Sequence, residues 1–249
     1  MKTYSFEMES QFGFFQWSKT KGDKRITNLF ISKTDILGIL GAVVGLDGYS
    51  QEYFKEVNKV EKQDTFYQAL GGLKVSIVPL SKPELFEDHL IHRSSHHINK
   101  KGSLMIYNYS LINPKYKIYF QQGEVDEKVF NNLIMYLSKG WAEYIPYAGK
   151  NTYPIDIKEF KEEELTENIA EKQVINSLFL EGNLKEEIMV FELELKEDEM
   201  YHYIESLKFF REGVETPDIY GQNMLWSSYE VSLEDPVFES VNGEKVVFY

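Results

Sequence analysis

The alternation of apolar and polar residues predicts two β-strands in the first third of the chain. Tyr4, Phe6 and Met8 are separated by polar residues over residues 3–9. A period of two is typical of a strand that has one face on the core. A second β-rich run, residues 73–78, stops at a proline, which has no backbone N–H to give to a neighbouring strand.

Three stretches have the pattern of a helix. The first, residues 34–46, follows Ser32 and includes Thr34, and either residue can cap the helix N-terminus. Residues 51–70 predict a second helix that ends at two glycines. Residues 126–138 predict a third, amphipathic helix with a glycine just beyond its end. The apolar face of this third helix consists of Val129, Phe130, Leu133, Ile134 and Leu137.

The rest of the chain is expected to add strands and one more helix. Residues 104–112 and 115–121 are rich in β-forming residues, and the Asn-Pro pair between them predicts a hairpin. Residues 188–195 have the pattern of a strand, and residues 199–210 that of a helix. A final hairpin is expected over residues 237–249, where an Asn-Gly pair favours a tight turn.

The order of these elements predicts the fold class. The first part of the chain is β, α, β, then an insertion at residues 80–102, then β and α. This order is typical of a ferredoxin-like α+β sheet. The insertion has no regular pattern and is expected to be irregular. The chain contains no internal repeat.

The helix predicted at residues 34–46 is unusual because it contains three glycines, each of which costs a helix roughly 1 kcal/mol relative to alanine. At about 100° per residue, Gly38, Gly41 and Gly45 lie within about 60° of one another, opposite the apolar residues. A bare helix face allows another backbone to approach closely. Two interpretations are open: contact with RNA or a neighbouring chain, or tight helix packing inside the fold. The spacing fits no phosphate-binding glycine motif.

Composition excludes several classes of protein. The chain has 249 residues, no cysteine and a net charge of −13. Without cysteine there is no disulfide framework and no thiolate metal site, and a reducing, cytoplasmic location is expected. The N-terminal residues lack an apolar signal core, and the longest apolar run is about half of the ~20 residues that a membrane span needs. We therefore expect no membrane association.

The charge is distributed unevenly. No Asp or Glu occurs from residue 89 to residue 123, and Asp23 is the only one from residue 10 to residue 34. Two acid-poor windows in an acidic chain are expected to converge on a polyanion, although each could be a solvated face. The residues assigned to polyanion binding are Lys19, Lys21, Lys24, Arg25, Arg93, His96, His97, Lys100, Lys101, Lys115 and Lys117.

Four of the five histidines lie in the predicted insertion. Histidine suits general-base chemistry near neutral pH, so His96, His97 and Lys100 would be the catalytic candidates if the chain cleaved RNA. His89, His92 and His96 have spacings that metal ligands can use, but no cysteine and no His-Glu-x-x-His motif accompanies them. We expect no catalytic residue, no metal and no cofactor.

The glycine helix and its surroundings resemble the N-terminal signature of a CRISPR-associated RAMP family, Cas protein five, in a type I-B-like form. This family caps the 5′ end of the guide RNA in type I Cascade complexes. The positions that match its Thr-Ala-Leu-x-Gly-Leu-Leu-Gly-Ala-Ile-Leu-Gly pattern are Thr34, Gly38, Gly41 and Gly45. Ile31 and Ser32 stand where the family has two prolines, and Asp35 stands where it has alanine.

Two later stretches add to the resemblance. "INPKYKIYF", residues 112–120, resembles the family's Asn-Pro-Lys strand, and "YIPYAGKNTYP", residues 144–154, resembles its Tyr-Leu-Gly-Lys-Ser loop. The resemblance covers most of residues 1–155 and the C-terminal third only loosely. Gly149, in the last of these stretches, joins the three helix glycines as an expected position of close backbone approach.

The resemblance implies an RRM-like RAMP palm with an inserted thumb and a small C-terminal β element. The palm would span residues 1–212, with the thumb at about 80–102, and the C-terminal β-hairpin element would span residues 213–249. Palm and thumb would hook the 5′ handle of the guide RNA (crRNA). The partners would be the backbone RAMP subunits and the large PAM-reading subunit of Cascade, with target DNA reached through the complex.

RNA binding also accounts for one strand of the predicted hairpin. Lys115, Lys117 and Tyr119 lie on one of its faces, and the aromatic and aliphatic residues between them lie on the other. We expect the first face to contact RNA or solvent and the second to join the core. Cations along the phosphates and aromatic rings against the bases are what hold single-stranded RNA.

We therefore expect a non-catalytic crRNA-binding subunit that acts in antiviral defence. The net charge of −13 is unfavourable for binding RNA alone, so the chain is expected to work inside an assembly. One branch of the family cleaves precursor crRNA without metal, using Tyr, Lys and His, but no such set can be aligned here. Two alternatives stay open. The chain could be a metal-independent endoribonuclease that processes precursor crRNA, or a protein-interaction scaffold that binds no RNA.

Overall fold

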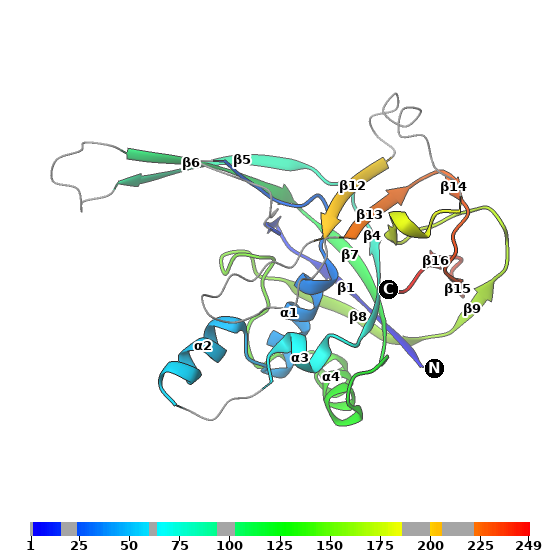
Figure 1. Ribbon diagram of the computed structural model, residues 1–249, viewed down its shortest axis with the longest axis horizontal. Helices are drawn as coiled ribbons and strands as arrows, with labels where there is room; N and C mark the ends of the chain where they lie inside the picture. The colour runs from blue at the N-terminus through cyan, green and yellow to red at the C-terminus, as the bar shows by residue number, and fades with distance from the viewer. Residues whose placement is uncertain (1, 16–23, 60–63, 94–102, 186–199, 206–221) are drawn as a thin grey trace.

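The structure, a computed structural model, describes residues 2–15, 24–59, 64–93, 103–185, 200–205 and 222–249. It combines helices with several mainly antiparallel sheets (Figure 1). What we call the central sheet has the strand order β4-β7-β1-β8, and all its pairs are antiparallel. Its strands are β1 (Thr3–Glu9), β4 (Lys74–Pro79), β7 (Lys115–Gln121) and β8 (Asp156–Glu163). The strands predicted at residues 3–9 and 73–78 are thus confirmed.

One face of the central sheet carries the hydrophobic core. Phe6 and Met8 of β1 are buried there, and Phe6 lies opposite Ile118 of β7. Helices α1 (Lys33–Val44) and α4 (Glu127–Lys139) pack on this face through their apolar residues. The alternation in the sequence therefore identified the buried side of the sheet.

Helix α1 has a capping residue at each end. The Ser32 hydroxyl accepts a hydrogen bond from the Asp35 backbone N–H, and the Asp35 carboxylate accepts one from the Ser32 N–H. This reciprocal capping confirms Ser32 as the N-cap. Gly45 is not part of the helix: it is the C-cap, with φ of +79°, a left-handed conformation that favours glycine.

The single helix predicted over residues 51–70 is wrong. The chain forms α2 (Tyr49–Val57) and α3 (Phe66–Leu70), two short helices with separate caps. The Thr65 hydroxyl accepts a hydrogen bond from the Gln68 N–H and starts α3. Thr65 also forms an isolated β-bridge with Asp47, a contact that a continuous helix would prevent.

Helix α4 matches its prediction closely. The Asp126 carboxylate accepts hydrogen bonds from the backbone N–H groups of Lys128 and Val129, and so caps the N-terminus. Phe130, Leu133 and Leu137 are buried, as the helical spacing predicts.

The hairpin predicted across Asn113-Pro114 is wrong. Strands β6 (Ser103–Ile112) and β7 do not pair, and they form one bent strand instead. The register against the N-terminal segment is unbroken: Glu9 faces Lys115, and Phe12 of β2 (Phe12–Gly13) faces Ile112. The Asn113 N–H donates to the Gln11 carbonyl, so the bend is held from the opposite strand.

The true hairpin lies in the segment that we expected to be irregular. Strand β5 (Leu85–Arg93) pairs antiparallel with β6, and both extend away from the body of the molecule (Figure 1). Strand β3 (Lys24–Ile26) runs parallel to β6 on its other side. The cross-strand pairing with β6 organises β5, although β5 has no clear alternation of its own.

The last part of the chain forms small sheets beside the central one. Strands β15 (Val237–Ser240) and β16 (Lys245–Val246) form the predicted terminal hairpin, and β15 also pairs with β9 (Leu165–Asn168). The remaining elements are β10 (Gln173–Val174), β11 (Phe179–Leu180), η1 (Glu181–Asn183), β12 (Met200–Glu205), β13 (Gln222–Ser227) and β14 (Glu230–Val231).

Two predictions in this part concern residues near or outside the described ranges. The helix predicted over residues 199–210 is wrong for its described part, because β12 is a strand that pairs with β13. The strand predicted at residues 188–195 lies outside the described residues, as does the boundary between 212 and 213. Within the described ranges, no helix is long and apolar enough to cross a membrane.

Candidate nucleic-acid interface

A groove opens beside the glycine-containing side of α1. Its volume is about 390 Å³, and its lining comes from α1, from the starts of α2 and α3, and from the loop at residues 141–154. The lining residues are Phe15, Thr34, Asp35, Gly38, Ile39, Ala42, Leu46, Gly48, Gln51, Phe66, Tyr144, Ile145, Tyr147 and Gly149. We call this feature the α1 groove.

The loop that forms one wall is tied to the C-terminal end of α1. The backbone N–H groups of Glu143 and Tyr144 donate to the carbonyls of Val43 and Ala42, over 2.9 and 3.0 Å. These carbonyls have no partner within the helix, so the loop satisfies them. The attachment leaves Tyr144, Ile145 and Tyr147 largely exposed at the groove.

Contrary to the prediction from the sequence, the three glycines of the helix do not form one bare face. A Cβ added to Gly41 would lie 2.4 Å from the Cβ of Phe66, so α3 packs directly on this position. A Cβ on Gly45 would lie 2.8 Å from Cγ of Glu143. Gly38 alone has room, with its nearest neighbour 3.9 Å away on the Phe66 ring. The alternative interpretation, packing inside the fold, therefore holds for Gly41, and only Gly38 faces the groove.

Gly149 shows close backbone approach, but from within the chain. Its φ is +77°, and a Cβ there would lie 1.8 Å from the Phe14 carbonyl oxygen. The Phe14 N–H donates to the Ala148 carbonyl over 2.9 Å. This glycine thus lets the loop at residues 141–154 pack against the segment that follows β2.

The lining of the α1 groove includes no carboxylate that lacks a hydrogen-bond partner. Asp35 is the only acidic residue among its lining, and its carboxylate accepts hydrogen bonds from the Ser32 hydroxyl over 2.6 Å and from the Ser32 N–H over 3.2 Å. Burial raises the pKa of Asp35, against the opposite effect of these hydrogen bonds. An anionic ligand would therefore meet little repulsion from the groove lining.

The expectation that Lys117 and Tyr119 lie on an open face is wrong. Both are buried beneath the turn of the β15–β16 hairpin. Lys117 Nζ lies 2.5 Å from Glu244 and 3.3 Å from Glu163, and the Tyr119 hydroxyl donates to the same Glu244 carboxylate. The C-terminal hairpin covers this side of the central sheet, so RNA cannot reach these side chains in this structure.

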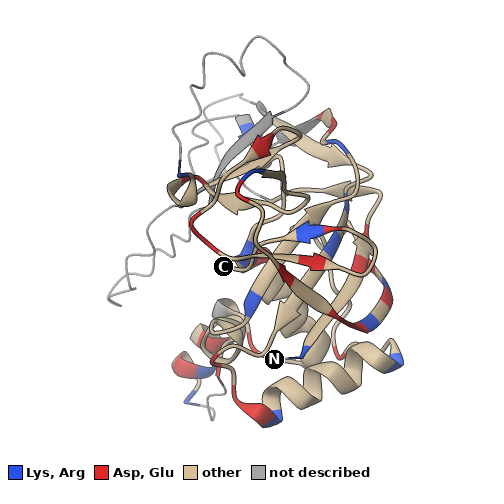
Figure 2. Cartoon of the chain, turned by 90° about the vertical axis from the view of Figure 1, so that its right-hand side faces the viewer, with Lys and Arg blue, Asp and Glu red and all other residues tan. Residues whose placement is uncertain are grey.

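Two other predicted cations are accessible. Arg25 is exposed on β3, in register with Asn108 of β6. Lys115 is about half exposed and pairs with Glu9, which also binds Lys158. Positive and negative residues are interspersed over the strands in this view (Figure 2), rather than separated into one basic field.

The side chains of the other predicted residues lie outside the described part of the structure. Lys19, Lys21, His96, His97, Lys100 and Lys101 lie outside the described residues. Lys24 lies in β3, and His89, His92 and Arg93 lie in β5, but their side chains are also outside the description. Among the residues that the structure does describe, no group of three or more His, Cys, Asp or Glu could hold a metal ion.

The structure adds aromatic residues that the charge-based search missed. At the base of the β5–β6 hairpin, the ring of Phe12 lies 6.0 Å from that of Phe86 and 5.6 Å from that of Tyr153. Lys150 Nζ lies 4.0 Å from the ring of Phe14 and 5.4 Å from that of Tyr153. One feature of the sequence indicated these aromatic contacts, namely the high aromatic content of residues 141–154.

Comparison with known proteins gives a likeness in structure alone. No family model and no curated protein matches the sequence. One solved structure, described as a CRISPR RNA-guided surveillance complex, aligns with a TM-score of 0.51 at 9% identity, over 93% of this chain and 91% of that one.

Two further structures align less well. A CRISPR protein from Archaeoglobus fulgidus gives a TM-score of 0.45 at 14% identity, over 99% of this chain and 98% of that one. A chain of the Type III-B Cmr-beta structure, determined with cognate target RNA and AMPPnP, gives 0.43 at 9% identity, over 93% and 86%. These structural neighbours are CRISPR-associated proteins, and at such identities the likeness is one of fold.

Proposed function

We propose that this chain is a non-catalytic subunit of a type I CRISPR surveillance complex, similar to Cas protein five of a type I-B-like system, that holds the 5′ handle of the crRNA. The α1 groove is the observation that carries the proposal. It combines exposed aromatic and aliphatic side chains with one open glycine and no free carboxylate. The structural likeness to a chain of an RNA-guided surveillance complex supports the same class of function.

The topology of the central sheet supports a RAMP-type fold. Among the central strands and the two long helices that pack on them, the chain order is β1, α1, β4, β7, α4, β8, and the spatial order of the strands is β4-β7-β1-β8. Two β-α-β halves with an antiparallel sheet in this order correspond to the ferredoxin-like arrangement. We propose that the projecting β5–β6 hairpin, which overlaps the predicted insertion at residues 80–102, serves as the thumb.

The groove has one part of the chemistry that single-stranded RNA requires, namely aromatic side chains for its bases, whereas its described lining includes no Lys or Arg for the phosphates. Bases stack on aromatic rings, and each stacked base contributes about 1–3 kcal/mol whatever its sequence. Tyr144 and Tyr147 are about half exposed, and Tyr147 and Gly149 lie at the same wall. Gly38 leaves space at the floor where a side chain would block a base or sugar.

The charge of the chain determines how it would act. A net charge of −13 opposes binding of RNA by the chain alone, because phosphate contacts supply most of the affinity. We propose that backbone RAMP subunits and a large PAM-reading subunit supply the remaining cations in the cytoplasmic complex. Target DNA would then be engaged by the complex as a whole, in antiviral defence.

The test is co-purification from cells that express the whole complex. An affinity tag on this chain should recover a discrete crRNA of about 40–60 nucleotides, and ultraviolet cross-linking should map its 5′ handle to residues 144–147. Replacing Tyr144 and Tyr147 together with alanine should weaken retention by at least tenfold, corresponding to the loss of about one stacked base.

Trp141 provides the matched control. It lies in the same loop and is about half exposed, but its ring lies against Lys139 rather than in the α1 groove. Trp141→Ala should therefore leave RNA retention unchanged. A complex that assembles without RNA, or in which the handle cross-links elsewhere, would support a protein scaffold and contradict the proposal.

A further inference from the structure

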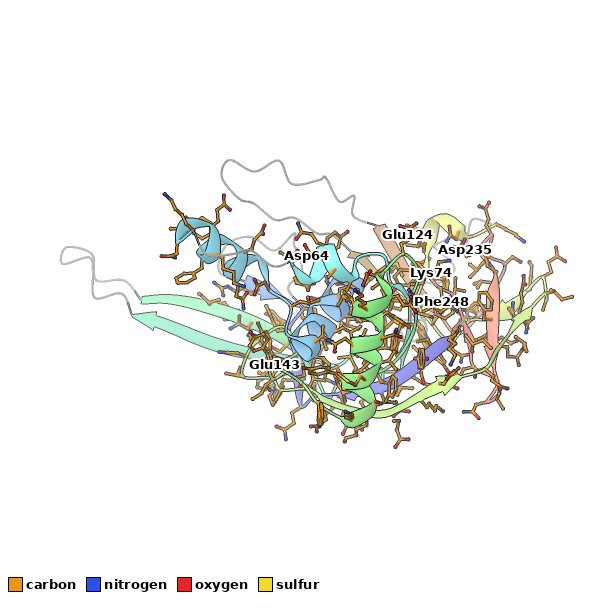
Figure 3. All side chains as sticks on the ribbon, turned by 90° about the horizontal axis from the view of Figure 1, so that it is seen from below. Asp64, Lys74, Glu124, Glu143, Asp235 and Phe248 are labelled. Atoms are coloured by element: carbon orange, nitrogen blue, oxygen red, sulfur yellow. The ribbon has the colours of Figure 1, made fainter. Side chains whose placement is uncertain are left out.

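A second pocket lies among the small sheets of the last part of the chain, away from the α1 groove. Its volume is about 320 Å³, and its walls are residues 168–173 between β9 and β10, residues 231–237 between β14 and β15, and Lys185. We call it the C-terminal pocket. Asp235, in the second of these loops, lies on the side of the molecule opposite to α2 and the β5–β6 hairpin (Figure 3).

Hydrogen bonds hold the walls of the C-terminal pocket together. The Ser232 hydroxyl donates to the Glu171 carbonyl over 2.7 Å, which joins the two loops. The Glu234 N–H donates to the Asn183 carbonyl over 2.7 Å, and the Asn183 side-chain amide donates to the Asp235 carboxylate. The fold itself therefore shapes the pocket, and a preformed site costs a ligand less ordering on binding.

The pocket contains a buried acceptor that the chain does not satisfy. Gln173 belongs to the lining and is only 5% exposed. Its Nε2 donates to the Ala170 carbonyl over 3.4 Å, whereas its Oε1 has no hydrogen-bond partner. Buried polar atoms are nearly always paired in folded proteins, because a buried oxygen without a donor destabilises the fold. A donor that enters the pocket can supply the missing hydrogen bond.

Two carboxylates at the same pocket also lack partners. Glu171 and Glu234 are exposed, and neither side chain forms a hydrogen bond or an ion pair with the described residues. Lys185 is the only cation among the described lining residues, and it pairs with neither of them. The pocket thus offers several acceptors and negative charge, which suits a ligand that has several N–H donors and a positive charge.

This chemistry disfavours other occupants. Free carboxylates repel the phosphates of RNA, and a second copy of this chain would bring its own net charge of −13. Among the residues that the structure describes, no group of three or more His, Cys, Asp or Glu could hold a metal ion. A guanidinium fits better, because its five N–H donors can bind a carboxylate and an amide oxygen together, and because its weak hydration suits the apolar wall at Val231 and Leu233.

We propose that the C-terminal pocket receives an arginine side chain from a neighbouring protein, whose guanidinium binds Glu171, Glu234 and the Gln173 Oε1. Ile169, which also lines the pocket, is 92% exposed, so the same neighbour can cover an apolar side chain beside the charged contact. Arginine anchors in desolvated pockets are typical of protein interfaces. The proposal rests on the proposed function only in placing the chain inside an assembly.

The first experiment identifies the neighbour. The tagged chain, with the photoreactive amino acid p-benzoylphenylalanine in place of Ile169, is purified from cells that express the whole complex, and the cross-linked peptide is identified by mass spectrometry after irradiation. We expect a cross-link to one other protein, within a few residues of an arginine. The same amino acid at Met135, a partly exposed apolar position on α4, should not cross-link to that segment.

The second experiment removes the negative charge. Glu171→Gln together with Glu234→Gln should lower recovery of the cross-linked neighbour by about tenfold or more, because the guanidinium loses both counter-charges. Asp64→Asn together with Glu143→Gln is the matched control. It removes the same charge at two exposed positions on the α2 side of the molecule (Figure 3), and recovery should stay unchanged.

Gln173→Met separates binding from folding. Methionine keeps the length of the side chain and removes the unsatisfied oxygen, so the free chain should melt at the wild-type temperature or above it. Recovery of the neighbour should fall by about fivefold, since one hydrogen bond to a charged donor is lost. A variant that melts well below the wild type would assign Gln173 to the fold alone and contradict its role as an acceptor for the ligand.

The outcomes separate this proposal from the RNA-binding one. A cross-link from position 169 to RNA, to a second copy of this chain, to a segment without arginine, or to nothing would overturn the docking proposal. If the complex retains its crRNA but gives no such cross-link, the proposed function stands and the docking proposal fails. If the cross-link to an arginine segment forms in a complex without RNA, the docking proposal stands and the proposed function fails.

Discussion

Lys117 Nζ lies 2.5 Å from Glu244 Oε2, and this contact joins the middle of the central sheet to the last turn of the chain. Glu163 of β8 lies 3.3 Å from the same ammonium, and the Lys117 side chain is only 7% exposed. One buried cation therefore holds two carboxylates that come from different elements. The arrangement fastens the C-terminal hairpin over the sheet face that would otherwise be open.

The first prediction concerns this cation. Lys117→Ala should lower the free energy of unfolding by about 3 kcal/mol, because it removes the buried cation that Glu163 and Glu244 share and leaves Glu163 with only its contact to Lys161. Urea denaturation of the free chain measures the change. Lys115→Ala, on the same strand, removes a half-exposed partner of Glu9 and should cost less than about 1 kcal/mol. Equal effects for the two variants would mean that the buried contact contributes no more than a surface pair.

The second prediction concerns acid. Burial raises the pKa of Glu163, but the hydrogen bond from Ser5, the charge of Lys117 and the contact with Lys161 together hold it below the ordinary value of 4.5. A lowered pKa in the folded state stabilises the fold above about pH 4.5, and this stabilisation is lost as pH falls through the folded value. Stability between pH 5 and pH 3 should thus decline less steeply in Glu163→Gln than in the wild type.

The third prediction separates two glycines of α1. Gly38→Ala should stabilise the free chain by about 0.4–1 kcal/mol, since there is room for a Cβ and alanine favours the helix. Gly41→Ala should destabilise it by about 1–3 kcal/mol, because the new Cβ would overlap Phe66. Thermal or urea unfolding decides this. Similar shifts in both variants would contradict the packing of α3 on Gly41.

The fourth prediction tests the charges assigned to the thumb. Replacing Arg93, Lys100 and Lys101 together with alanine should weaken retention of crRNA by the complex and reduce its salt dependence, because fewer phosphate contacts release fewer counterions. Retention measured over a series of salt concentrations checks both effects. An unchanged affinity and an unchanged slope would remove these residues from the RNA-binding set.

The fifth prediction is that the chain alone does not cleave repeat RNA. Incubation of the purified protein with labelled repeat RNA, in the presence of a metal chelator, should leave the substrate intact. If cleavage occurs and is abolished by His96→Ala or His97→Ala, the chain belongs with the metal-independent endoribonucleases instead.

Local patterns in the sequence correctly predicted the elements whose determining residues lie close together along the chain. The alternation around Phe6 predicted β1 and its buried face, and the amphipathic spacing with a glycine just beyond it predicted α4 to within one residue at each end. For α1 the sequence narrowed the N-cap to Ser32 or Thr34, and the structure shows that it is Ser32. The terminal hairpin followed in the same way from its Asn-Gly turn.

The structure differs from the prediction where the local sequence pattern was compatible with more than one backbone conformation. Asn113-Pro114 looks like a hairpin turn, yet it is a bend, because residues 9–13 pair with both strands in one continuous register. Similarly, β5 has little pattern of its own and becomes a strand through its partner β6. Pairing between distant segments contributes hydrogen bonds that no local propensity contains.

The candidate sites show the same division. The sequence by itself determined that Lys117 and Tyr119 lie opposite the core residues of β7, since side chains alternate along a strand. Only the tertiary structure decided that Glu244, 127 residues away from Lys117, covers them, and that Phe66 fills the side of α1 at Gly41 while Gly38 stays open. Burial depends on which distant segments come together, and that information is not contained in the spacing of residues along one helix or strand.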